Sequence, residues 1–373
     1  MYLLNEMLLF LPLVIYAWYR IRRLIAKRLF KHLWTVLYVL LILAYPAAES
    51  LSHRSISALA RPFMLAGYYA LPFLLYLTLT VVIADLIVGL ARLTTLLSKE
   101  TVQRPRFRRV RLGLLLMIPA AVVIAGIVNY HYLRVRQYLQ VVVPGRAAEA
   151  PGLNIVFAAD FHLGSLTAGG FMDRFVAKVN ALNPDIVLIG GDVLEGHRPE
   201  EGAEKFAAPF RQLHPMFGVY AVPGNHEGYG GNRDDFFARA GIKLLRDSAV
   251  KIDNVCYLVG RNDGRSRNRR SIEELLREIP DDMPVIVLDH RPTDLERVSL
   301  SPVDIQLSGH THHGQLFPVN LVTKRRYELS WGYLKKRQTH FFVTSGVQLW
   351  GPPVRTAGYS EILNIQVSFE YID

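Results

Sequence analysis

The sequence contains a single cysteine, Cys256, among 373 residues. One cysteine excludes an internal disulfide framework and any zinc site built on cysteine pairs. Because Cys256 lies in the short apolar run 255–259, we expect its side chain to be a small buried hydrophobic group. A single cysteine is therefore compatible with an oxidising and with a reducing compartment.

Acidic residues are scarce in the first 150 residues, which contain 5 Asp and Glu against 18 Lys and Arg. Residues 151–373 are nearly neutral, with 27 acidic and 25 basic residues. The net charge of +11 thus lies in the part of the chain that is richest in long apolar runs. Basic flanks of membrane helices account for this distribution better than a nucleic-acid-binding surface does. We therefore expect the lipid bilayer as a partner and no nucleic acid.

Long apolar runs dominate residues 1–139 and indicate an N-terminal α-helical membrane domain with four transmembrane helices. A helix needs about 20 apolar residues to cross a bilayer, and the second of the four runs is the shortest. No basic segment precedes the first run, so we expect it to be retained and not cleaved as a signal peptide. The four runs are 1–19, 33–48, 66–90 and 112–133.

The segments that connect these runs alternate in charge. Segments 20–31 and 92–111 are rich in Lys and Arg, whereas the segment between the second and third runs has only Arg54 and Arg61. Because basic segments stay in the cytoplasm, the C-terminal half of the chain is expected on the extracytoplasmic face of a multi-pass plasma (inner) membrane protein. This topology requires the second run to span. Asp85, inside the third run, has no obvious partner in the sequence.

After a predicted linker at 140–152, residues 153–373 alternate short apolar runs with helical periodicity. This alternation predicts a C-terminal α/β domain. Strands are predicted at 154–159, 185–190, 218–222, 285–288 and 304–307, and helices at 170–182, 202–213, 233–240 and 271–279.

Each predicted strand ends in a carboxylate, imidazole or amide side chain. These oxygen and nitrogen donors include no thiolate, which suits Mn, Fe, Zn or Mg. Seven such residues are too many for one ion and suit two ions about 3.5–4 Å apart that share a carboxylate. The seven are Asp160, His162, Asp192, Asn225, His290, His310 and His312.

The order of these blocks resembles the calcineurin-like metallophosphoesterase superfamily. The blocks D-x-H, G-D, G-N-H-[DE], a lone H and G-H-x-H occur in this order over 154–312. The stretches 224–231, 307–315 and 343–362 resemble its membrane-anchored bacterial branch. The resemblance covers most of 141–373 and implies a four-layer α/β/β/α sandwich with metal-dependent phosphoric ester hydrolase activity.

The resemblance also implies a role for each residue. The first of two divalent metal ions would be bound by Asp160, His162 and His312, the second by Asn225, His290 and His310, with Asp192 bridging them. A metal-bridging hydroxide would attack phosphorus. His226 would act as the catalytic residue that contacts the phosphate or protonates the leaving oxygen. Glu195 stands where the family often has Asp, and His313 where the branch usually has Gly.

Three further residues are candidate substrate contacts. Arg261 and Arg265 belong to the arginine-rich run 261–270, whose guanidinium groups match phosphate oxygens, although a solvated loop is an equal reading. His313 would either contact the substrate or be a partly exposed residue without a catalytic role.

The sequence favours a membrane-bound phosphoesterase that hydrolyses a phosphodiester, phosphomonoester or pyrophosphate, lipid-linked or derived from the cell envelope. A UDP-diacylglucosamine-type lipid pyrophosphohydrolase is a second candidate, and it requires a cytoplasmic catalytic domain. A membrane sensor or scaffold with a non-catalytic metal-binding domain is a third, and degenerate ligands would favour it. Apart from Asp85, the apolar runs lack the buried polar residues of a transporter path.

Overall fold

The computed structural model describes residues 2–52, 60–144, 148–164, 166–195, 203–228 and 234–370, with side chains from Phe10 onward. The chain forms two compact units. The helical unit comprises Met1–Val128 and Gly351–Thr356. The other unit, called the catalytic unit after the activity that the resemblance implies, comprises Asn129–Trp350 and Ala357–Asp373. The boundary predicted at residues 139 and 140 therefore shifts toward the N-terminus, because strand β1 (Arg134–Pro144) pairs within the catalytic unit.

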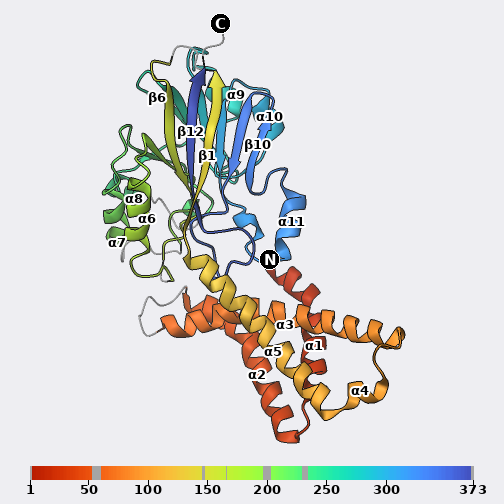
Figure 1. The fold of residues 1–373 in the computed structure, drawn as a ribbon. Coiled ribbons are helices and arrows are strands. Elements are labelled where there is room, and N and C mark those ends of the chain that lie inside the picture. The colour runs from red at the N-terminus through yellow and green to blue at the C-terminus, as the bar shows by residue number, and fades with distance from the viewer. Residues whose placement is uncertain are drawn as a thin grey trace. The chain divides into compact units, whose positions relative to one another are not determined.

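Three helices of the helical unit are long and apolar enough to cross a membrane: α2 (Arg28–Ser52), α3 (Arg61–Leu93) and α5 (Pro105–His131) (Figure 1). They correspond to the second, third and fourth predicted spans. Helix α1 (Tyr2–Leu24) covers the first predicted span. Within the described residues it is not one of the helices that are long and apolar enough to cross a membrane, so a fourth span stays a prediction. A short helix, α4 (Lys99–Gln103), precedes α5.

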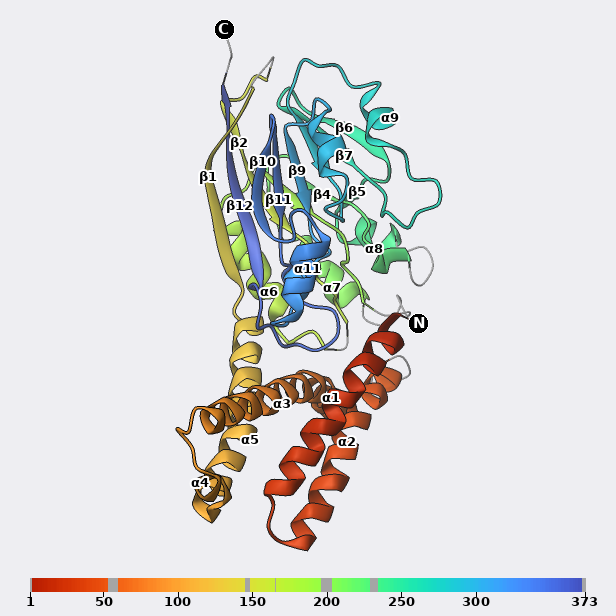
Figure 2. The same cartoon turned by 90° about the vertical axis from the view of Figure 1, so that its right-hand side faces the viewer.

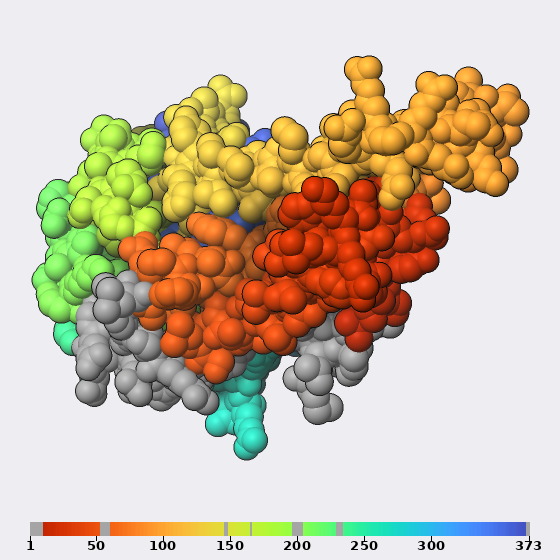
Figure 3. All heavy atoms as spheres, turned by 90° about the horizontal axis from the view of Figure 1, so that it is seen from below, coloured from red at the N-terminus to blue at the C-terminus, as the bar shows by residue number. Residues whose placement is uncertain are grey.

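Helices α1, α2 and α3 pack against one another and form a continuous surface, seen from below in Figure 3. Gly67 of α3 lies so close to the Ala44 carbonyl of α2 that no side chain fits there, as in small-residue contacts of membrane helices. Asp85, without an obvious partner in the sequence, pairs with Arg20 and Arg111 and accepts a hydrogen bond from Tyr16. The intramembrane carboxylate is thus neutralised inside the bundle.

The catalytic unit contains two six-stranded mixed sheets with helices around them (Figures 1 and 2). The first sheet has the order β1-β12-β2-β3-β4-β5, and the second has the order β10-β11-β9-β8-β7-β6. Strand bounds are β2 (Gly152–Ala158), β3 (Ile186–Ile189), β4 (Val219–Ala221), β5 (Lys243–Leu244), β6 (Ser248–Ile252), β7 (Cys256–Gly260), β8 (Val285–Leu288), β9 (Ile305–Ser308), β10 (Gly332–Lys336), β11 (Thr339–Val343) and β12 (Glu361–Glu370). Helix bounds are α6 (Phe171–Asn180), α7 (Ala203–Phe210), α8 (Asp234–Arg239), α9 (Ile272–Leu276), α10 (Leu295–Ser299) and α11 (Val319–Arg326).

Alternating side chains of the strands build three apolar clusters. Val156 and Ala158 of β2 pack toward helices α6, α7 and α8, whereas Ile155 and Phe157 face the second sheet. A third cluster joins the second sheet to α9 and α10. All five predicted strands and all four predicted helices of this unit are confirmed.

Strand directions fix one edge of the first sheet. Strands β2, β3 and β4 are parallel, so their carboxyl ends meet at this edge. Strand β1 is parallel to β12, which is antiparallel to β2, so β1 begins at the same edge. We call it the metal edge, because the predicted ligands follow the carboxyl ends of these strands.

Candidate metal centre

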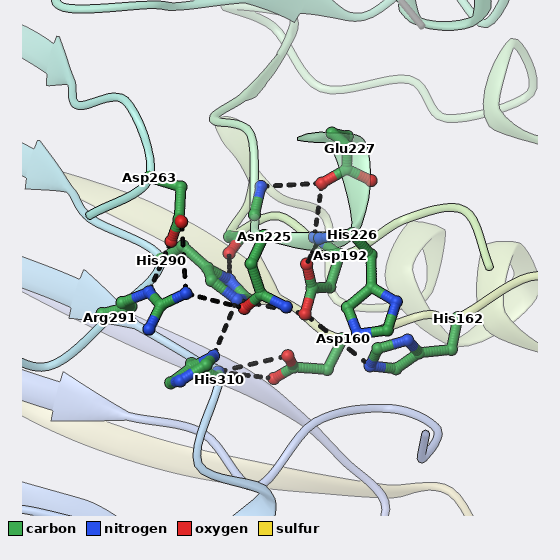
Figure 4. Close-up of polar contacts among 12 residues, drawn as sticks. Asp160, His162, Asp192, Asn225, His226, Glu227, Asp263, His290, Arg291 and His310 are labelled. Atoms are coloured by element: carbon green, nitrogen blue, oxygen red, sulfur yellow. Dashed lines mark hydrogen bonds and ion pairs between the residues drawn. The ribbon is translucent and has the colours of Figure 1, made fainter. Parts of the chain in front are cut away.

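The structure brings the predicted ligands together from both sheets (Figure 4). Asp160 and His162 follow β2, and Asp192 follows β3. His290 follows β8, and His310 follows β9. Buried strands thus deliver these side chains to one place from segments that are far apart in the sequence.

The first group consists of Asp160, His162 and His312, whose ligand atoms lie within 4.8 Å of one another. The Nε2 atoms of His162 and His312 are 3.2 Å apart, and His312 Nε2 is 3.8 Å from Asp160 Oδ1. Two imidazole nitrogens that face each other beside a carboxylate form a donor set suited to a divalent cation. These are the three residues predicted for the first metal.

The second group consists of Asp192, His290 and His310, also within 4.8 Å. His290 Nε2 lies 3.1 Å from Asp192 Oδ2 and 3.2 Å from His310 Nδ1. The same Asp192 oxygen is 3.9 Å from His162 Nε2 of the first group. This carboxylate therefore lies between the two groups, at the position predicted for the bridging ligand. Asn225 is buried nearby, and its Oδ1 accepts a hydrogen bond from Arg291 at 3.3 Å.

The backbone at these ligands is strained. Five of the seven predicted ligands have positive φ angles, although none is glycine. The left-handed region costs an ordinary residue roughly 1–2 kcal/mol, and such residues cluster at functional sites. Positive φ angles thus occur at most of the predicted ligands, as they often do at functional sites. The five are Asp160, His162, Asp192, His310 and His312.

Glu195 joins the predicted catalytic His226 to the ligand His162. Its Oε2 lies 2.6 Å from His162 Nδ1 and 3.1 Å from His226 Nδ1. Burial opposes ionisation, but hydrogen bonds from the two imidazoles lower the pKa of Glu195 to about 2. Burial alone would lower the pKa of His162, yet the hydrogen bond to Glu195 raises it to about 9. An oriented imidazole whose other nitrogen faces the metal site is the usual arrangement around protein-bound metals.

Glu227 holds the loops that follow β3 and β4. Its buried carboxylate accepts hydrogen bonds from the backbone N–H groups of Asp192 at 2.9 Å, Val193 at 2.8 Å and Gly224 at 2.7 Å. Gly224 is packed against the Asp192 carboxylate with no room for a side chain. The G-N-H-E block thus contributes the predicted ligand Asn225 and also the Glu227 clamp, a carboxylate that holds the two loops together.

Arg291 and Asp263 were not among the predicted site residues. The Nε of Arg291 donates to Asp263 Oδ2 at 2.5 Å, which aims the guanidinium at Asn225. The sequence signal for Arg291 was its position directly after His290, and Asp263 matches an acidic position common in the branch, to which no role had been assigned.

The three predicted substrate contacts have different surroundings. Arg261 is buried, and its Nη1 donates to Asp289 at 2.9 Å, so its charge is directed to the residue before His290. Arg265 is exposed. Burial, followed by the charges of His290 and Arg291, lowers the pKa of His310, and Arg265 adds only a smaller effect. His313 is buried against the ring of Trp331, 4.8 Å between centroids, so its description as partly exposed is wrong.

Comparison with known proteins agrees with this geometry. The family model of calcineurin-like phosphoesterases matches residues 153–314. A transmembrane protein with metallophosphoesterase domain from Danio rerio is 32% identical over 302 residues, covering 74% of this chain and 68% of that protein. The chain belongs to the calcineurin-like phosphoesterase family. The Danio rerio match covers a larger share of the chain than the catalytic unit does, so the similarity extends into the helical unit.

Bacterial metallophosphoesterases are also similar. One of Helicobacter pylori is 34% identical over 223 residues, covering 58% of this chain and 60% of that protein. One of Aquifex aeolicus is 29% identical over 246 residues, covering 64% and 92%. The matched region thus spans about 60% of the length of the Helicobacter pylori relative.

Proposed function

We propose that this membrane metallophosphoesterase hydrolyses a phosphate ester with two divalent metal ions. The observation that carries the proposal is the Asp192 carboxylate, 3.1 Å from His290 and 3.9 Å from His162 in two separate donor groups. A shared carboxylate between two such groups is the arrangement of two-metal hydrolases. The Asp, Asn and His donors fit Mn, Fe, Zn or Mg, and the ions' identity is left open.

We assign separate roles in metal binding, proton transfer and substrate binding to the residues of the site. Asp160, His162 and His312 would hold one ion, Asn225, His290 and His310 the other, and Asp192 both. When bound, the two ions would lower the pKa of coordinated water and polarise the phosphoryl oxygens. His226, kept in place by Glu195, would donate a proton to the leaving oxygen. Arg291 and Arg265 supply positive charge for a substrate phosphate near His310.

We further propose that the catalytic unit faces the extracytoplasmic side of the plasma membrane. Helices α2, α3 and α5 supply three candidate spans, an odd number. With the basic segment 20–31 inside, α5 ends outside whether or not α1 spans. A lipid-linked or envelope-derived phosphodiester, monoester or pyrophosphate is the substrate class that this location offers.

The test is hydrolysis of bis-p-nitrophenyl phosphate and p-nitrophenyl phosphate by the full chain in detergent, with Mn²⁺ or EDTA. We expect metal-dependent release of nitrophenolate that falls at least about 100-fold in Asp192→Asn and His226→Ala. Glu204→Gln, at an exposed residue outside the site, should retain full activity. The ratio of the two rates would show a preference for diesters or monoesters.

Equal rates in Asp192→Asn and the unaltered chain would refute the two-metal mechanism. Folded protein that binds Mn²⁺ but releases no nitrophenolate under any condition would favour the non-catalytic sensor or scaffold.

A further inference from the structure

Helix α11 (Val319–Arg326) exposes all three of its aliphatic side chains, unlike an ordinary surface helix, which packs them against the core. Val319, Leu321 and Val322 are exposed, with Val322 at 70%. Asn320 is buried, and within the described part of the chain its Oδ1 accepts no hydrogen bond. Phe317, just before the helix, is also 53% exposed. A helix that exposes its aliphatic side chains and buries an amide is suited to contact an apolar partner.

The charge of α11 identifies that partner. Its last turn carries Lys324, Arg325 and Arg326, all exposed, and the helix contains no acidic residue. Aliphatic side chains next to a basic cluster match the boundary between acyl chains and anionic headgroups.

Helix α11 lies beside the metal centre. It packs on the 3-10 turn His312–Gly314, where Gly314 fits tightly against the backbone of Asn320. At the other end of α11, the ring of Tyr327 contacts the ring of His310, with 6.3 Å between centroids. A surface bound through α11 would therefore lie next to two predicted metal ligands.

The chain path brings the same part of the catalytic unit within reach of a bilayer. Only Tyr132 and Leu133 separate the end of α5, a candidate span, from β1. Strand β1 begins at the metal edge, the edge toward which α11 also lies (Figures 1 and 2). The tether thus limits how far the metal edge can move from the membrane surface.

We propose that α11, with Phe317, is a membrane-docking element that inserts into the interface of an anionic bilayer beside the metal centre. Phe317, Leu321 and Val322 would enter the acyl boundary, and the three basic residues would bind headgroup phosphates. With α11 docked, a phosphate ester carried by a lipid would reach the metal centre from the membrane surface. This contact depends on the surface of α11 and not on turnover.

The test places a fluorophore on α11 in the full chain. Val322→Cys is labelled with an environment-sensitive NBD dye and reconstituted at one copy per lipid nanodisc. Leu300→Cys is the matched control, since Leu300 is 68% exposed in the same unit and precedes β9, whose other end leads to His310. Discs contain phosphatidylcholine alone or with phosphatidylglycerol, and a spin-labelled lipid serves as quencher.

We expect a blue-shifted spectrum and strong lipid quenching for the dye at position 322, severalfold greater with phosphatidylglycerol, and neither change at position 300. Replacing Lys324, Arg325 and Arg326 by Gln should abolish the dependence on phosphatidylglycerol. Adding Asp192→Asn should leave the quenching unchanged, which separates docking from catalysis. Equal quenching at positions 322 and 300 in both lipids would overturn the proposal, because α11 would then face water.

Discussion

Glu195 contacts two imidazoles with one carboxylate oxygen, 2.6 Å from His162 and 3.1 Å from His226. Glu195→Gln removes the charge but keeps the size, so both rings should lose their fixed orientation. We expect nitrophenyl phosphate turnover to fall about 10–100-fold, as for partners that orient metal ligands. Steady-state kinetics with Mn²⁺ titration would separate a loss in kcat from weaker metal binding.

Glu195→Asp, which restores the residue common in the family, should recover part of the lost activity. Because the pKa of Glu195 is lowered to about 2, its stabilising contribution is complete above its ordinary pKa. This contribution is lost only as the pH falls toward 2. A Glu195→Gln variant as active as the unaltered chain would show that the contacts of Glu195 with His162 and His226 are not needed for turnover.

Cys256 is fully buried, and burial raises the pKa of its thiol to about 12. A thiol in this state supplies almost no thiolate at neutral pH, so it should not react with Ellman's reagent in the folded protein. One thiol per chain should appear after denaturation. Stoichiometric reaction of the native protein within minutes would contradict the placement of Cys256 in the core.

Single residues of the site were predictable to different degrees. Side chains such as Asp160 and His310 could be found from the sequence because short blocks at strand ends fix their residue types. Arg291 could not be found, since its role depends on Asp263, which reaches it from the separate 261–270 run. The environment of His313 was equally hidden, because Trp331 lies beyond α11 in the chain.

Among the elements, the loops after β3 and β4 depend on the buried Glu227 carboxylate. Glu227→Gln leaves one of its oxygens unable to accept, so at least one buried N–H loses its partner. The cost is about 1–3 kcal/mol for each such group, and we expect a lower melting temperature together with reduced metal affinity. Thermal unfolding of the full chain, followed by tryptophan fluorescence, measures the first effect.

The matched control is Glu204→Gln. Glu204 forms an exposed ion pair with Arg211, and such pairs contribute about 0–1 kcal/mol. Similar melting temperatures for the Glu227 and Glu204 variants would show that the clamp contributes little.

Elements were predictable where their pattern is local. The runs that became β2, β3, β4, β8 and β9 are short and apolar and end in ligand blocks, so each could be placed from its own residues. The pairing of β1 with β12 could not, because it joins Arg134 to Glu361 across most of the catalytic unit. The predicted linker at 140–152 accordingly overlaps the end of β1 and the start of β2.

At the scale of the whole molecule, the proposed membrane orientation rests on the three candidate spans and the basic segments 20–31 and 92–111. We expect an alkaline phosphatase fused after the C-terminus to be active in bacterial cells, and green fluorescent protein fused there to remain dark. Replacing the basic residues of 20–31 and 92–111 by Gln should weaken this preference. The opposite pattern of reporter activity would place the catalytic unit in the cytoplasm and favour the UDP-diacylglucosamine-type substrate.

The directions of β1 and β12 also determine how the catalytic unit would respond to force. The chain enters at the start of β1, at the metal edge, and β12 ends at the opposite edge, while the two strands are adjacent and parallel. A pull between these two points loads the hydrogen bonds of the pair in shear, so that many must break together. The tether at the start of β1 therefore transmits tension from the far end of β12 along the strands, in the direction of shear.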